Sequence, residues 1–139
     1  MSRKRPLPVF DHANLCRASA DDRFGRIYEG MLRHAKWAEL SPASKILYVV
    51  AVTHTATALN YRTLKWYREK NGLPEKDFSD GTFFILTQEQ LREYGINTHR
   101  YSERFAELCR SGFIETIHSN AHRKMPNLYR LSGGWKEKP

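Results

Sequence analysis

Two helix start signals on either side of one glycine constrain this chain most. Thr87 suits the position just before a helix, and Gln90 follows at the spacing of a capping box, where each side chain bonds the other residue's backbone amide. Asn97 is a second good cap. Gly95 lies between them and can take the left-handed conformation that a tight turn needs. We therefore predict two short helices joined by a turn rather than one long helix.

The second predicted helix has one apolar face. Tyr101, Phe105 and Leu108 are spaced i, i+4 and i+7, so they share that face. Ile96 precedes the helix at the spacing of a hydrophobic staple with Tyr101. The residues expected on the opposite, outward face are His99, Glu103, Ala106 and Arg110. This pattern predicts a helix that buries one side and presents polar groups on the other.

A glycine and two apolar runs follow the second helix. Gly112 is expected to end it, and Phe113, Ile114 and Ile117 then fit a strand. Residues 127–131 form a second apolar run, so the two runs predict a hairpin. Its turn carries the basic or titratable side chains His122, Arg123 and Lys124.

The chain before Thr87 predicts further helices and one short strand. Ser41 can cap a helix whose first residue is Pro42, where a missing amide hydrogen costs nothing. Residues 46–59 are apolar almost all round, which favours a central helix, although their β-branched run also fits a strand. Residues 25–40 fit one side of an earlier helix.

The segment before the two capped helices adds a short helix and a strand. Residues 62–71 predict a helix with Leu64 and Tyr67 turned inward and Gly72 as its stop. Residues 82–86 predict a strand. The chain of 139 residues is expected to form one domain, mainly α with a small antiparallel β-sheet, an α+β fold.

The chain divides into three segments on this interpretation. Residues 1–23 predict a flexible basic arm with four arginines. Residues 24–135 predict the folded domain, with an insertion at about residues 60–81, and residues 136–139 predict a tail.

Composition favours a polyanionic partner and excludes several other classes. Lys and Arg number 23 against 15 Asp and Glu, a net charge of +8. Cys16 and Cys109 form no C-x-x-C pair, so neither a disulfide framework nor a zinc site is expected. The same scarcity of cysteines leads us to expect a cytoplasmic location. The longest apolar run, residues 46–52, is too short to cross a membrane, so no membrane partner is expected.

Motifs of catalysis are missing from the sequence. His118 and His122 are four residues apart, but they fall in an expected loop, and no H-E-x-x-H motif occurs. The sequence also has no P-loop and no G-x-S-x-G motif. We therefore expect a binding protein that is not an enzyme and needs neither a cofactor nor a metal.

The stretch LTQEQLREYGINTHRYSERFAELCRSGFIET resembles the winged helix-turn-helix family. The later PNLYRLSGGW and the earlier LRHAKWAELSPASKILYVVAV resemble segments of replication-associated winged-helix proteins of plasmids, phages and integrative elements. The resemblance extends from about Gly25 to Trp135. It implies a winged-helix fold that binds double-stranded DNA in the replication or maintenance of a mobile genetic element.

The resemblance also implies which residues touch DNA. It makes residues 97–104 the recognition helix and residues 118–124 the wing. Base edges are expected to meet Thr98, His99, Ser102 and Glu103, because the start of a recognition helix usually enters the major groove. Phosphates are expected to meet Arg100, Arg104, His122, Arg123 and Lys124.

Two other functions remain open on the sequence alone. The carboxylates Glu103 and Glu107 at the predicted recognition face are compatible with a module that docks a replication or transfer protein. A transcriptional repressor acting as a homodimer is the second alternative, and it would bind half-sites one helical turn apart.

Overall fold

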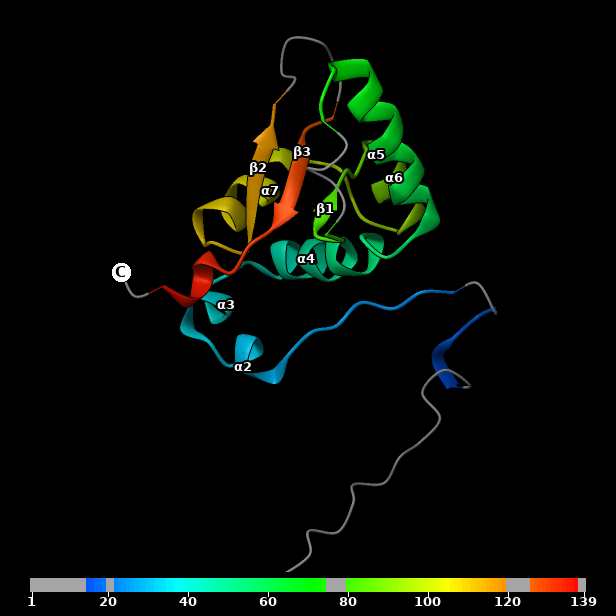
Figure 1. Cartoon of the computed structure of the whole chain (residues 1–139). Coiled ribbons are helices and arrows are strands. Elements are labelled where there is room, and N and C mark those ends of the chain that lie inside the picture. Colours follow the sequence, from blue (N-terminus) through cyan, green and yellow to red (C-terminus); the bar gives the residue numbers. More distant parts are fainter. Residues whose placement is uncertain (1–14, 20–21, 75–79, 120–125, 138–139) are drawn as a thin grey trace, which may run out of the picture.

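The chain is described by a computed structural model over residues 15–19, 22–74, 80–119 and 126–137 (Figure 1). Within these ranges it is a mixed α+β protein with helices on both sides of a small antiparallel sheet. The helices are α2 (Glu29–Leu32), α3 (Ala35–Ala38), α4 (Pro42–His54), α5 (Ala58–Asn71), α6 (Gln88–Glu93), α7 (Tyr101–Arg110) and the 3-10 turn η2 (Gly134–Lys136). The strands are β1 (Phe83–Phe84), β2 (Ile114–His118) and β3 (Leu128–Leu131).

The single helix predicted over residues 25–40 is wrong, because the chain forms α2 and α3 instead. His34 has an extended backbone between them, and its Nδ1 accepts a bond from the Lys36 amide at 3.1 Å. That bond caps α3 and stops α2 from continuing. Residues 22–28 run extended along α4 before α2 begins (Figure 1). Gly25 lies so close to α4 that a Cβ there would be 2.7 Å from Val52 Cγ1.

Helix α4 begins as the sequence predicts. The Ser41 hydroxyl accepts a bond from the Ser44 amide, and Pro42 occupies the first turn. The β-branched run belongs to this helix and not to a strand. Burial is one-sided, since Leu47 is buried whereas Ile46 is 57% exposed. Residues 46–59 are therefore not one buried helix.

Helix α5 is longer than predicted and begins at Ala58. Thr57 caps it by accepting a bond from the Asn60 amide, and Gly72 ends it in the left-handed conformation. Leu64 and Tyr67 are buried as expected. The Asn60 amide group donates to the Phe83 carbonyl and accepts from the Ile85 amide, which fastens α5 to β1.

The sheet has the order β1-β3-β2, with every neighbour antiparallel. The central strand β3 pairs Tyr129 with Phe84 of β1 and with Thr116 of β2. Successive residues of β3 face opposite sides. Tyr129 joins the larger core beneath α4 and α7, whereas Leu128 joins a smaller core beneath α5. Helices α5 and α7 therefore cover opposite faces of the sheet.

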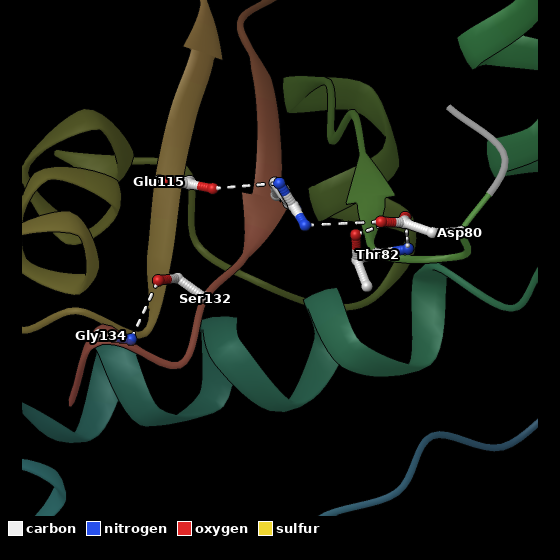
Figure 2. A network of polar contacts seen from close by, with 6 residues as sticks. Asp80, Thr82, Glu115, Ser132 and Gly134 are labelled. Carbon is white, nitrogen blue, oxygen red and sulfur yellow. Dashed lines mark hydrogen bonds and ion pairs between the residues drawn. The ribbon is translucent and has the colours of Figure 1, made fainter. Parts of the chain in front are cut away.

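Arg130 of β3 connects both outer strands on the α5 side of the sheet (Figure 2). Its guanidinium lies 3.7 Å from the Glu115 carboxylate of β2 and 3.6 Å from the Asp80 carboxylate before β1. Asp80 also accepts bonds from the hydroxyl and amide of Thr82, and these bonds lower the pKa of Asp80. The three charged side chains are partly exposed, so the network aligns the strands more than it stabilises them.

The chain beyond β3 folds back against the end of α7. Ser132 donates its amide to the Phe113 carbonyl at 2.9 Å, and Trp135 donates its amide to the Gly112 carbonyl at 3.0 Å. The Ser132 hydroxyl accepts from the Gly134 amide and fixes the turn between them (Figure 2). The closure requires a residue without a side chain at Gly112.

Gly112→Ala is expected to destabilise the protein more than Gly95→Ala. Their φ values are 83° and 76°, so each alanine carries left-handed strain of roughly 1–2 kcal/mol. At Gly112 the new Cβ would also lie 2.5 Å from the Trp135 nitrogen, whereas nothing lies within 4 Å at Gly95. Urea denaturation of the two variants measures the difference. Equal losses would contradict a tight closure at Gly112.

Candidate functional site

Helix α6 has the start that the sequence predicts. Thr87 Oγ1 accepts from the Gln90 amide at 3.1 Å, and Gln90 Oε1 accepts from the Thr87 amide at 3.1 Å, which completes the capping box. Leu86 and Leu91 flank this cap and are both buried in the larger core. The start of α6 is thus fixed by polar bonds on one side and apolar burial on the other.

The turn after α6 is built around Gly95. Its φ is 76°, as expected for a left-handed glycine. The Gly95 amide donates to the Arg92 carbonyl and the Ile96 amide to the Leu91 carbonyl, both at 2.9 Å. This pair of bonds is a Schellman motif, which ends a helix and redirects the chain sharply. The prediction of two helices separated by a glycine turn is confirmed.

The second helix begins later than predicted, at Tyr101 and not after Asn97. The Asn97 side chain accepts from the His99 amide at 2.9 Å, so it closes a turn instead of capping a helix. Arg100 occupies the cap position with a left-handed backbone, φ 57°. Thr98, His99 and Arg100 therefore stand in the turn before α7. The recognition helix predicted over residues 97–104 is shortened at its start.

Helix α7 buries the predicted apolar face and exposes the predicted polar one. Phe105 and Leu108 are buried, and the Phe105 ring stacks on Tyr129 with ring centroids 4.5 Å apart. The outward side chains are exposed: Ser102, Glu103, Ala106 and Arg110. His99 in the preceding turn is exposed as well. The aromatic stack fixes which side of α7 faces solvent.

Glu107 ties α7 to the start of α4. Its carboxylate accepts bonds from the Ser41 amide at 3.2 Å, the Ser41 hydroxyl at 2.7 Å and the Ser44 hydroxyl. Burial alone would raise the pKa of Glu107, but the bonds from Ser44 and Ser41 and the charge of Arg104 outweigh it and lower the pKa. A carboxylate is also favoured near the positive end of a helix. Glu107 is thus occupied within the fold and does not belong to the outward face.

A second tie joins the turn to the other end of α4. The Nδ1 of the buried His54 forms a hydrogen bond with the Tyr94 hydroxyl at 2.9 Å, and the two rings meet edge to face. Burial lowers the pKa of His54, which favours its neutral form. Helix α4 therefore holds the helix pair at both ends, through Glu107 and through Tyr94.

A pocket of about 220 Å³ lies between α4, the turn and α7. Ala43 and Leu47 of α4 form part of its apolar wall, and His99 and Arg104 lie on its polar side. Arg100, between the lining residues His99 and Tyr101 in the chain, is exposed. The lining residues thus place one guanidinium group and one imidazole next to an apolar hollow at the start of α7.

The hairpin expected after α7 is present as the antiparallel pair of β2 and β3. Its predicted basic turn, with His122, Arg123 and Lys124, lies outside the described residues. At the base of the turn, the His118 Nδ1 is 2.9 Å from the hydroxyl of the buried Tyr67. Helix α5 therefore supports the end of β2 from which the turn departs.

The described ranges hold neither a metal-binding cluster nor a membrane-spanning helix. No three His, Cys, Asp or Glu side chains of these ranges lie close enough together to hold a metal ion. No helix within them has the length and apolar character needed to span a membrane.

Glu107 is the site residue whose role the sequence did not reveal. Its partner Ser41 is 66 positions away, so no local spacing signals the contact. The one available signal is chemical, because Ser41 and Ser44 place two hydroxyls at a predicted helix start, where a carboxylate is favoured.

Comparison of the chain with protein-family models, with curated proteins and with solved structures found no match. The function of the α6–α7 site is therefore inferred from its geometry and from the sequence pattern.

Glu107→Gln is expected to lower the free energy of unfolding at neutral pH by roughly 1–3 kcal/mol, because charged hydrogen bonds are lost. Since the folded-state pKa of Glu107 is lowered, its contribution is full above the unfolded pKa and disappears as pH falls through the folded pKa. The difference between wild type and variant should therefore shrink in acid. Urea denaturation at several pH values measures it.

Glu103→Gln is the matched control, because Glu103 lies on the same helix and is exposed. It should leave stability nearly unchanged at every pH. A Glu107→Gln difference that does not vary with pH would contradict the assigned role of the carboxylate.

Proposed function

We propose that this chain is a winged helix that binds double-stranded DNA. The observation that carries the proposal is the outward face of α7, which starts beside Arg100 and Arg104 and is held in place by Phe105 and Glu107. A helix presented in this way fits a major groove. The β2–β3 hairpin follows directly, and its predicted basic turn would reach the phosphates.

The order of elements also supports this fold. A strand, β1, leads into the α6–α7 pair, and the hairpin that follows returns so that β3 pairs with β1. The turn of that hairpin is therefore attached to the same sheet that supports α7. The strands that flank the proposed wing and the helix α7 are thus held by one sheet.

The late start of α7 sharpens the proposed roles of the side chains. Ser102 and Glu103 lie in the first turn of α7, where base edges are normally read, and Glu103 could accept from a cytosine amine. Thr98 and His99 would approach bases from the preceding turn. Arg100 and Arg104 would bind phosphates, together with His122, Arg123 and Lys124 of the wing.

The biological role follows from the resemblance alone. We infer a part in the replication or maintenance of a mobile genetic element, by binding and not by catalysis, in the cytoplasm. Docking of a replication or transfer protein is the alternative favoured by the exposed Glu103 and Ala106. A homodimeric repressor is the other alternative, and selection of a palindromic duplex would distinguish it.

Arg100→Ala combined with Arg104→Ala is expected to weaken duplex binding strongly and to reduce its salt dependence. Two phosphate contacts would be lost, so the slope of log affinity against log salt should fall by about 2. Arg123→Ala with Lys124→Ala should act in the same way. Fluorescence anisotropy with a duplex from a random-sequence selection, at several salt concentrations, measures both.

Arg33→Ala is the matched control, because it removes an exposed cation that pairs with Glu29 on α2, away from α7. It should leave the salt slope unchanged. An unchanged slope in both double variants would contradict the proposed DNA contact. Absence of salt-sensitive duplex binding in the wild type would favour the protein-docking alternative.

Base contacts need a different measurement. Substitution of Thr98, His99 or Ser102 by alanine is expected to change the preference at one base pair by ~1–3 kcal/mol. Repeating the duplex selection with each variant detects that change. A selection profile identical to that of the wild type would remove the residue from base readout.

A further inference from the structure

Helix α5 has an outward face that takes no part in the proposed DNA contact. Its inner face is fixed to the sheet through Asn60, Leu64 and Tyr67, which are all buried. The Asn60 amide group donates to the Phe83 carbonyl of β1 and accepts from the amide of Ile85, which follows β1. The outward side chains are therefore carried by a rigid helix that is capped by Thr57 and ended by Gly72.

Aromatic rings and cations are interleaved on that face. Tyr61 is 71% exposed and Trp66 is 44% exposed. Arg62, Lys65 and Lys70 are exposed among them. Four-residue spacing makes Tyr61 a neighbour of Lys65, Arg62 a neighbour of Trp66, and Trp66 a neighbour of Lys70.

The cations of this face have no acidic partner in the part of the chain that the structure describes. Within the described ranges, Arg62, Lys65 and Lys70 make no ion pair, although Glu69 lies on the same helix. Trp66 is oriented by its edge-to-face contact with the buried Tyr67, with ring centroids 6.5 Å apart. The surface thus offers an oriented indole beside cations that form no ion pair within the described ranges, with the exposed Glu69 among them.

We propose that this face of α5, made of Tyr61, Arg62, Lys65, Trp66 and Lys70, binds single-stranded nucleic acid. Exposed rings stack on unpaired bases, and neighbouring cations bind the phosphates that connect them. A duplex hides the faces of its bases, so it would use the cations but leave the rings without partners. The combination of both groups on one helix selects the single strand as the occupant.

This surface and the outward face of α7 lie on opposite sides of the sheet. Helix α5 covers the side of the sheet that holds Leu128, whereas α7 covers the side that holds Tyr129 (Figure 1). One chain could therefore hold a duplex and a single strand at the same time. The inference goes beyond the proposed function and does not require it.

The test is a titration of the full chain with fluorescein-labelled oligothymidylate, followed by anisotropy at several salt concentrations. Salt-sensitive binding is expected for the wild type. Trp66→Ala should weaken it roughly 5- to 100-fold, because one base loses its stacking partner. Arg62→Glu with Lys65→Glu should weaken it and flatten the salt slope. Trp66→Phe should retain most of the affinity.

Intrinsic fluorescence reports stacking directly. Trp37 is buried and Trp135 stacks on Phe113, so Trp66 is the most exposed of the three indoles. Unlabelled oligothymidylate should quench the wild type, and the quenching should be lost in Trp66→Phe although binding persists. Circular dichroism melting of each variant establishes that it is folded.

Tyr28→Ala with Arg26→Glu is the matched control, because it changes an exposed ring and a cation outside α5. It should bind oligothymidylate like the wild type. Wild-type affinity in Trp66→Ala would overturn the proposal, as would loss of binding only in Arg100→Ala with Arg104→Ala. If the α5 variants weaken duplex and single strand equally, base stacking on α5 is overturned. Failure of duplex binding alone would leave this proposal intact and contradict only the proposed function.

Discussion

The bonds between Glu107 and the start of α4 are the interaction on which the arrangement of the candidate site most depends. The carboxylate accepts from Ser41 and Ser44, and so it fixes α7 against the helix that carries the larger core. The opposite side of α7 is fixed by the stack of Phe105 on Tyr129. With these two contacts in place, the helix can turn neither about its axis nor away from the sheet. The outward residues are therefore presented in one orientation.

Much of the local structure could be predicted from the sequence where the determining contacts are close in the chain. The capping box of Thr87 and the glycine turn at Gly95 involve residues at most a few positions apart, and both are present as expected. Asn97 was mispredicted because its side chain can cap a helix or close a turn, and spacing does not distinguish the two. Glu107 and α5 depend on partners far away in the chain, at Ser41 and at Phe83. Such contacts leave no periodic signal.

The sheet separates two surfaces of different chemistry. On one side α7 presents a mixed polar face with two arginines at its start, which suits the edges and backbone of a duplex. On the other side α5 presents Tyr61 and Trp66 among cations, which suits unpaired bases. Because β3 contributes to both cores, the two surfaces belong to one rigid frame. A protein built in this way could hold a duplex beside a strand that has been separated from it.

In the proposed complex, the start of α7 and the turn before it contact duplex DNA. An amide chemical-shift map of the isotope-labelled full chain, titrated with a duplex taken from a random-sequence selection, tests this contact most directly. We expect the largest changes in residues 97–106 and in the β2–β3 turn, with α5 amides little affected. Changes that spare residues 97–106 while the duplex is bound would contradict the proposed contact.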